Sequence, residues 1–234
     1  MTIERKSDSS FVTDADRRGE EILRARLADR CGDDGVIGEE FGVVDGSTGR
    51  SWTLDPIDGT FAFVHGVPTW CVLIALLDGD RSVLGVIHLP ALGETVYAGR
   101  GLGCRWVRGG EAPVPARVSD VDALPRALTL ATDLGRLPGS DLGTAFARLR
   151  AAVGELRTWG DGWGHALVAT GRAEAMIDPR MAPWDSAPLQ PIVEEAGGRF
   201  TTLAGEAVPA GGSAVSTNGA LHDAVLRVLA GASV

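Results

Sequence analysis

The sequence predicts a layered α+β fold in a single domain over residues 1–234. Its length and ordinary globular composition, with 44% hydrophobic and 23% charged residues, fit one compact unit. In the first half, apolar runs alternate with short turns, a pattern typical of antiparallel hairpins. In the second half, strand-like and helix-like patterns alternate. Hairpins followed by an alternating pattern indicate sheets covered by helices.

The first half is expected to contain one helix, two short strands and two hairpins. Thr13 followed by Asp14 and Asp16 is typical of a helix start, because the hydroxyl and carboxylates satisfy free backbone N–H groups. Pro56 has no N–H group and is expected to end the strand before it. The expected ranges are a helix over 13–31, strands over 36–37 and 51–54, and hairpin pairs over 70–77 with 82–88 and 95–97 with 105–107.

The second half alternates strands and helices after a loose boundary near residues 119–125. This boundary separates a metal-binding N-terminal part, 1–122, from a C-terminal part, 123–234. Pro188 is tolerable in a first helical turn, whereas Pro191 is expected to distort the helix that contains it. The expected strands cover 127–131, 155–158, 173–177, 199–203 and 214–217, and the expected helices cover 141–153, 162–170, 185–196 and 221–229.

Charge and cysteine usage exclude several classes of partner. The formal net charge of −9 disfavours nucleic acid and anionic membrane surfaces. The longest apolar run, 70–77, is too short to span a bilayer, and the N-terminus lacks the apolar core of a signal peptide. Cys31, Cys71 and Cys104 are widely spaced and odd in number, as expected for reduced thiols. We therefore expect a cytoplasmic protein without a nucleic-acid or membrane partner.

Oxygen ligands for a metal are concentrated in one short segment. Asp55 precedes Pro56, and Asp58 follows two residues later, so a turn brings the two carboxylates together with the Ile57 carbonyl between them. Two carboxylates and a carbonyl suit magnesium better than zinc or copper. Gly59 then permits close approach of a phosphate to the backbone, and the Thr60 hydroxyl can hold a water molecule. Taken alone, this sequence is also a common turn.

Two further acidic segments, Glu39-Glu40 and Trp184-Asp185, fall beside predicted strand or helix ends. Alone, the first is most often a solvated pair and the second a helix cap. If Glu39, Asp55, Asp58 and Asp185 lie close together, the repulsion among four negative charges raises their pKa values until some of them are protonated, unless cations are bound. Two or three divalent cations would neutralise these carboxylates and create a site for a phosphate.

The order of these motifs resembles the inositol monophosphatase family. The resemblance covers nearly the whole chain, and it implies a layered α/β sandwich and a magnesium-dependent phosphomonoesterase that acts on a small soluble phosphate ester, typically as a homodimer. The matching positions are Asp16, Glu39-Glu40, the segment 55–60, Trp184-Asp185 and Gly197-Gly198.

The resemblance also assigns roles to individual residues. Glu39, Asp55 and the Ile57 carbonyl resemble a first metal site, and Asp55, Asp58 and Asp185 resemble a second one. Glu39 and Thr60 resemble the pair that orients the attacking water, with Asp16 supporting Thr60. Gly59 and Thr60 resemble the phosphate cradle.

Within the family, the chain is most similar to the histidinol-phosphate phosphatases. Gly160-Asp161 is the informative segment, because inositol-specific relatives tend to have Gly-Ser-Ala there. We expect Asp161, Asp178 and His165 to contact the substrate beyond its phosphate, and L-histidinol phosphate to be that substrate. Asp161 as a helix cap and Asp178 as a turn residue are the ordinary alternatives. Inositol 1-phosphate, another sugar, nucleotide or specialised phosphate, and a non-catalytic phosphometabolite-binding role also stay open.

Two departures from the family pattern bear on assembly and pocket shape. Relatives usually have a further N-terminal helix before the segment that starts here near Lys6, so exposed apolar surface is expected, with either a homodimer or marginal stability as its consequence. Phe61-Ala62 follows Thr60 where relatives often have a polar or basic residue and Asn. We expect this change to alter the mouth of the pocket.

Overall fold

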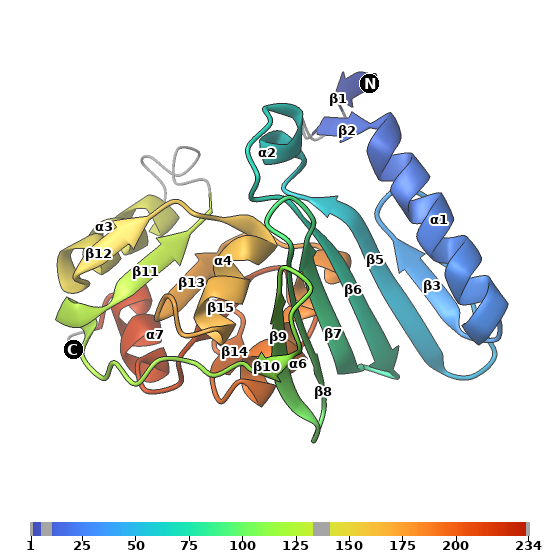
Figure 1. The fold of residues 1–234 in the computed structure, drawn as a ribbon. Coiled ribbons are helices and arrows are strands. Elements are labelled where there is room, and N and C mark those ends of the chain that lie inside the picture. Colours follow the sequence, from blue (N-terminus) through green and yellow to red (C-terminus); the bar gives the residue numbers. More distant parts are fainter. Residues whose placement is uncertain (1, 6–10, 133–140, 233–234) are drawn as a thin grey trace.

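The computed structural model describes residues 2–5, 11–132 and 141–232, and these residues form alternating layers of helices and sheets (Figure 1). Helix α1 (Asp14–Cys31) covers the outer face of a large sheet. Helices α4 (Asp161–Ala169) and α6 (Leu189–Glu195) lie between that sheet and a smaller one. Helices α3 (Asp141–Ala152) and α7 (His222–Ala230) pack together on the far side of the smaller sheet. The expected layered fold is confirmed.

The larger sheet has eight strands in the order β10-β9-β8-β7-β6-β5-β3-β4. All neighbours are antiparallel except β3 and β5, which are parallel. The two expected hairpins are confirmed as β6–β7 and β8–β9. The strands are β3 (Gly35–Gly38), β4 (Gly42–Val44), β5 (Arg50–Asp58), β6 (Cys71–Asp78), β7 (Arg81–Leu89), β8 (Glu94–Gly99), β9 (Gly103–Arg108) and β10 (Val114–Pro115).

The smaller sheet has five strands in the order β12-β11-β13-β15-β14. Strand β11 runs parallel to β12 and β13, whereas β15 runs antiparallel to β13 and β14. Its strands are β11 (Leu128–Ala131), β12 (Glu155–Arg157), β13 (Ala175–Asp178), β14 (Arg199–Thr201) and β15 (Ala214–Thr217). The short elements outside both sheets are β1 (Ile3–Arg5), β2 (Phe11–Thr13), α2 (Thr60–Val64), the 3₁₀ turn Leu124–Arg126 and α5 (Pro183–Ser186).

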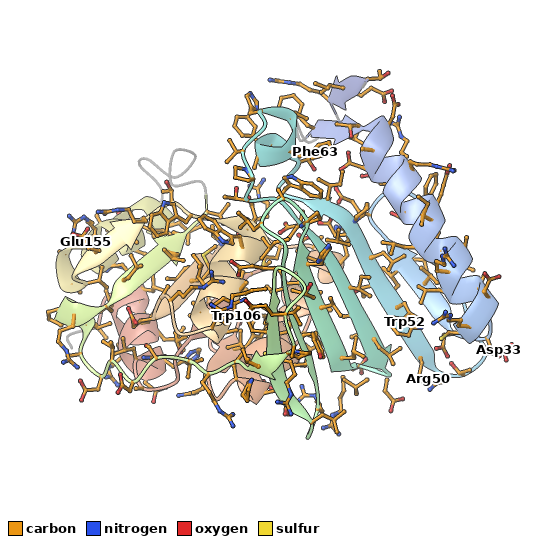
Figure 2. The ribbon with its side chains drawn as sticks, viewed as in Figure 1. Asp33, Arg50, Trp52, Phe63, Trp106 and Glu155 are labelled. Carbon is orange, nitrogen blue, oxygen red and sulfur yellow. The ribbon has the colours of Figure 1, made fainter. Side chains whose placement is uncertain are left out.

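Helix α1 begins where the sequence predicts. The Thr13 hydroxyl accepts a hydrogen bond from the Ala15 N–H, and the Asp16 carboxylate accepts one from the Thr13 N–H. Trp52 of β5 lies beneath this helix (Figure 2). Beside it is a mainly apolar groove of about 580 Å³, lined by Leu23, Arg26, Leu27, Arg30, Cys31, Trp52, Leu54, Ile74, Leu84 and Val86.

Two predictions about proline were wrong in detail. Pro56 does not end its strand: β5 continues to Asp58, and its register against β6 shifts between Asp55 and Asp58. The irregular pairing at this point accommodates a residue without an N–H group. The helix expected over 185–196 is two helices, α5 and α6, and the break falls at Pro188 rather than at Pro191. Pro191 lies in the first turn of α6, where its missing N–H group costs nothing.

The main hydrophobic core lies between the larger sheet and helices α4 and α6. Leu73 and Ile87 of the sheet pack there with Leu189 and Ile192 of α6, and all four side chains are fully buried. Helix α6 also packs on β14 of the smaller sheet, which joins the two halves. The described helices include none that is both long and apolar enough to cross a membrane.

Candidate active site

The Asp55–Thr60 segment begins in the irregular last residues of β5 and ends in a turn at Gly59. The Ile57 N–H donates a hydrogen bond of 2.9 Å to Asp55 Oδ1, across Pro56. Asp58 is the last residue of β5 and pairs with Cys71, the first residue of β6, so it lies where these two strands meet the loops. Asp58 Oδ2 accepts hydrogen bonds from the Gly162 N–H at 2.6 Å and from Cys71 Sγ at 3.1 Å. These contacts orient the side chain of Asp58.

Three of the predicted metal ligands come together in the structure. Asp55, Asp58 and Asp185 each offer a carboxylate oxygen, and these oxygens lie within 4.8 Å of one another. Asp185 arrives from α5, where its carboxylate accepts a hydrogen bond of 2.7 Å from the Ala182 N–H. Glu39 follows β3, and its N–H donates to the Leu54 carbonyl at 3.2 Å, immediately before Asp55.

The carboxylates of this cluster repel one another. Burial raises the pKa of Asp55 well above its ordinary value, and the charges of Glu39, Asp58 and Asp185 raise it further. The pKa of Asp58 is also raised well above its ordinary value, first by burial and then by Asp161 and Asp185. Burial, with Glu39 and Asp178, raises the pKa of Asp185 to about 7. The protein without a cation therefore disfavours the ionised forms of these groups.

This donor set fits magnesium. All the converging ligands are hard oxygens, the type that magnesium prefers over the sulfur and nitrogen ligands of softer metals. A divalent cation among Asp55, Asp58 and Asp185 would also remove the repulsion that raises their pKa values. The three carboxylates of the cluster can therefore hold a divalent cation.

Thr60, Asp16 and Gly59 lie beside the cluster. Thr60 Oγ1 is 3.3 Å from Asp16 Oδ1 and 3.0 Å from the Ile57 carbonyl oxygen, and Asp16 is fully buried. The single hydroxyl proton of Thr60 can be donated to one of these acceptors at a time, which leaves its lone pairs for a water proton. Gly59 has φ of 79°, and an added Cβ would lie 3.0 Å from Asp161 Oδ2. Only glycine fits there without strain.

Two of the predicted substrate-binding residues, Asp161 and Asp178, lie beside the carboxylate cluster. Asp178 ends β13, and its Oδ2 accepts a hydrogen bond of 2.9 Å from Thr132 Oγ1. The same hydroxyl oxygen accepts a hydrogen bond of 3.1 Å from the Asp161 N–H. Burial and the Asp161 charge raise the pKa of Asp178 to about 7. Asp161 has φ of 58° and is the only non-glycine residue with positive φ in the part of the chain that the structure describes.

His165 occupies a different environment from Asp161 and Asp178. Its side chain is fully buried, and Nδ1 forms a hydrogen bond of 2.7 Å with Ser216 Oγ on β15. Its Nε2 is buried without a hydrogen-bond partner. Full burial and the bond to Ser216 favour a structural role for His165 over a contact with the substrate. On α4, the side chain of His165 faces the smaller sheet. The predicted helix over 162–170 did not indicate this orientation.

Two residues that contact the site were missed by the sequence analysis. Cys71 was treated only as a reduced thiol, because the predicted hairpin pairs its strand with residues 82–88; the pairing of β6 with β5, which places Cys71 next to Asp58, was not predicted. Thr132 follows β11, which runs parallel to β13. Both strands were predicted, over 127–131 and 173–177, but not their parallel pairing; parallel neighbours end on the same side of a sheet, and this pairing brings Thr132 to Asp178.

Burial of His165 has a measurable consequence at acid pH. Burial lowers the pKa of His165 from 6.5 to about 3, so below pH 6.5 the unfolded chain takes up a proton that the folded chain does not. The free energy of unfolding should therefore fall with decreasing pH, with a share from His165 of about 2 kcal/mol between pH 7 and pH 5. His165→Gln should remove this share in urea unfolding measured with saturating magnesium. An imidazole of His165 that titrates near pH 6.5 in NMR spectra of the folded protein would contradict the placement.

Comparisons with known proteins agree with this geometry. The sequence profile of the inositol monophosphatase family matches residues 1–232. A histidinol-phosphatase of Mycobacterium tuberculosis is 45% identical, with 98% of this chain and 88% of that protein covered, and a histidinol-phosphatase of Chlorobaculum parvum is 42% identical, with 92% and 82% covered. The solved structure of an IMPase from Thermotoga maritima has a TM-score of 0.86 at 31% identity, with 99% of this chain and 88% of that one covered. The chain is therefore a phosphoric monoester hydrolase that belongs to the inositol monophosphatase family.

Proposed function

We propose that this enzyme hydrolyses L-histidinol phosphate to L-histidinol and inorganic phosphate, with two or three magnesium ions at the acidic cluster. The observation that supports this substrate is the acidic pair Asp161 and Asp178, which is linked through Thr132. The pair lies beside Gly59, where the phosphate is proposed to bind. The similarity to two histidinol-phosphatases points in the same direction. A cytoplasmic location belongs to the same proposal, and the free thiols Cys31, Cys71 and Cys104 are consistent with it.

Each residue of the site has a defined task in this reaction. Asp55, Asp58 and Asp185 would hold magnesium in one site, and Glu39, Asp55 and the Ile57 carbonyl would hold it in another. Magnesium, when bound, supplies positive charge to the phosphoryl oxygens and makes water more acidic. Thr60 accepts a hydrogen bond from the attacking water, and the Glu39 carboxylate accepts its proton. The water oxygen forms a bond to phosphorus as the ester P–O bond breaks. The leaving alkoxide takes a proton from solvent, to which Glu39 then returns the proton that it accepted.

The remaining residues position the phosphate and the substrate's organic part. Gly59 allows the phosphate to approach the backbone, and the short helix α2 begins at the next residue without a side-chain cap. Asp161 Oδ2 lies next to Gly59. A carboxylate beside Gly59 suits a substrate with a cationic amine or imidazolium group, and it repels a substrate with additional phosphates.

A comparison of phosphate esters tests the proposed substrate. With magnesium present, we expect a higher kcat/KM for L-histidinol phosphate than for inositol 1-phosphate, fructose 1,6-bisphosphate or nucleoside monophosphates. Inorganic phosphate release should stop on chelation and return when magnesium is added. Preference for inositol 1-phosphate would replace the proposed substrate but leave the phosphatase assignment intact. Absence of hydrolysis with every ester, together with tight binding of one of them, would instead favour a non-catalytic binding protein.

A homodimer also belongs to this proposal. The apolar groove beside α1 exposes surface that a monomer would leave in contact with water. We expect light scattering coupled to size-exclusion chromatography to give twice the mass of the 234-residue chain. A monomer with high thermal stability would contradict this expectation.

A further inference from the structure

Helix α1 contains a second buried carboxylate, one turn after Asp16. Glu20 is fully buried, although no chemical role in the reaction requires it. Its Oε2 accepts a hydrogen bond of 2.7 Å from the Glu40 N–H, and its Oε1 accepts one of 3.2 Å from the Phe41 N–H. Both donors belong to the turn that directly follows Glu39. Glu20 therefore binds the backbone of the turn that presents a predicted metal ligand and water-orienting group.

The charge of Glu20 is compensated within its own helix. Arg24 Nε donates a hydrogen bond of 2.7 Å to Glu20 Oε1, and an Arg24 terminal nitrogen donates to the Gly42 carbonyl at the other end of the same turn. The turn is thus held at three backbone positions by one ion pair from α1. A buried carboxylate without such partners would be strongly unfavourable, so the pairing explains how the helix tolerates Glu20 in this position.

The backbone of β3 makes room for this carboxylate. A Cβ added to Gly38 would lie 1.9 Å from Glu20 Oε1, a distance that no side chain can occupy without displacing the carboxylate. The glycine before Glu39 is therefore required by Glu20 and not by its own backbone conformation, since its φ is not positive. The Glu20 carboxylate thus packs directly against the backbone of Gly38, although the two residues are distant in the sequence.

Asp16 and Glu20 are four residues apart and lie on the same face of α1. Asp16 faces Thr60, and Glu20 binds the turn after Glu39. We infer that Glu20 is a positioning residue: together with Asp16 it lets one rigid helix fix the separation between Glu39 and Thr60, the two groups that orient the attacking water in the proposed reaction. This inference rests on the proposed function for its kinetic consequence, but the contact itself can be tested without catalysis.

Glu20→Gln is the variant that tests this inference. A glutamine amide has one acceptor oxygen, whereas Glu20 uses both oxygens to accept from N–H groups, so an NH₂ group would face a donor. We expect the Glu40 and Phe41 amides to exchange with solvent at least about tenfold faster, because they lose bonds to a charged acceptor. We expect kcat to fall by about 10²-fold, on the scale of a small misplacement of a catalytic group, with little change in KM for the phosphate ester. The magnesium concentration for half-maximal activity should rise.

Two further variants make this experiment decisive. Glu21→Gln is the same substitution one position along the helix at an exposed ion pair with Arg18, and it should change neither amide exchange nor kcat. Gly38→Ala should displace Glu20 without removing its charge, and it should reproduce the Glu20→Gln phenotype. Because both variants break the same contact, the double variant should be no worse than the more severe single one.

The possible outcomes separate this inference from the proposed function. Unchanged exchange of the Glu40 and Phe41 amides in Glu20→Gln would overturn the positioning role, whatever the substrate. A loss of activity that merely follows the loss of folded protein, with kcat per folded molecule unchanged, would overturn it as well. If the Glu40 and Phe41 amides exchange faster in Glu20→Gln, but the wild type prefers some other phosphate ester, the positioning role is supported and histidinol phosphate is rejected as the substrate.

Discussion

Asp55→Asn should lower kcat/KM by at least about 10³-fold, the scale observed when a main electrostatic stabiliser of a transition state is removed. Asp55 is the carboxylate expected to bridge two magnesium sites, and it is the buried member of the cluster. Asparagine preserves the turn, since its oxygen can still accept the Ile57 N–H that Asp55 Oδ1 accepts now. The loss should therefore come from charge and metal binding, and not from altered backbone geometry.

The stability of the same variant should change in the opposite direction. The pKa of Asp55 is raised by burial and by neighbouring carboxylates, so ionising this group at neutral pH costs free energy in the metal-free protein. Asp55→Asn removes that cost, and the metal-free variant should have a Tm equal to or above that of the wild type. Magnesium should raise the Tm of the wild type more than that of the variant. Asp80→Asn, at an exposed hairpin turn, serves as the control in both assays.

Full activity of Asp55→Asn in the absence of magnesium would contradict the metal mechanism. A strongly lowered Tm of the metal-free variant would contradict the electrostatic argument even if activity is lost, because misfolding would then explain the loss. Initial-rate kinetics and thermal unfolding, each with and without a chelator, distinguish these cases.

Asp161→Asn should remove most of the preference for L-histidinol phosphate over inositol 1-phosphate. A buried charge-assisted contact contributes roughly 1.5–3 kcal/mol, which corresponds to about a tenfold to hundredfold preference. Asparagine is the informative replacement, because Asp161 has φ of 58° and asparagine tolerates this left-handed region as aspartate does. The Asp161 and Gly162 N–H groups would keep their acceptors, Thr132 Oγ1 and Asp58 Oδ2.

Turnover of a generic aryl phosphate is the internal control for Asp161→Asn. This substrate lacks a cationic group, so its kcat/KM should change little. Asp141→Asn alters an exposed aspartate at the start of α3 and should leave both specificity and rate unchanged. Equal turnover of the two natural esters by the wild type, or an unchanged preference in Asp161→Asn, would limit the assignment to a general phosphatase. Phe61, which is 67% exposed beside Thr60, would then be the next residue to test for specificity.

Local interactions explain why much of this protein was predictable. Thr13 and Asp16 cap α1 within a single turn of chain, and Ile57 closes its turn on Asp55 two residues away. The β6–β7 hairpin forms across a two-residue turn. In each case the partners are near neighbours in sequence, so residue type and spacing restrict the backbone to few conformations. Roles taken from the family resemblance depended on the same short motifs.

Distant contacts required the tertiary structure, because spacing along the chain carries no information about which face of a helix meets which strand. Pro56 was expected to end β5, yet pairing with β6 keeps the strand going to Asp58. His165 was expected near the substrate, yet α4 turns it toward Ser216, 51 residues away.

By itself, the sequence determined the fold class, the main strands and helices, and the segments that supply the acidic ligands, because these depend on short-range backbone preferences and apolar periodicity. Only the tertiary structure decided which of those side chains meet. In the sequence, Glu20 is one of several acidic residues on a charged helix. In the folded protein β3 lies close to α1, and the Glu20 carboxylate binds the turn after Glu39. The physical reason is that burial, and with it the need for a hydrogen-bond partner, arises only when the layers pack.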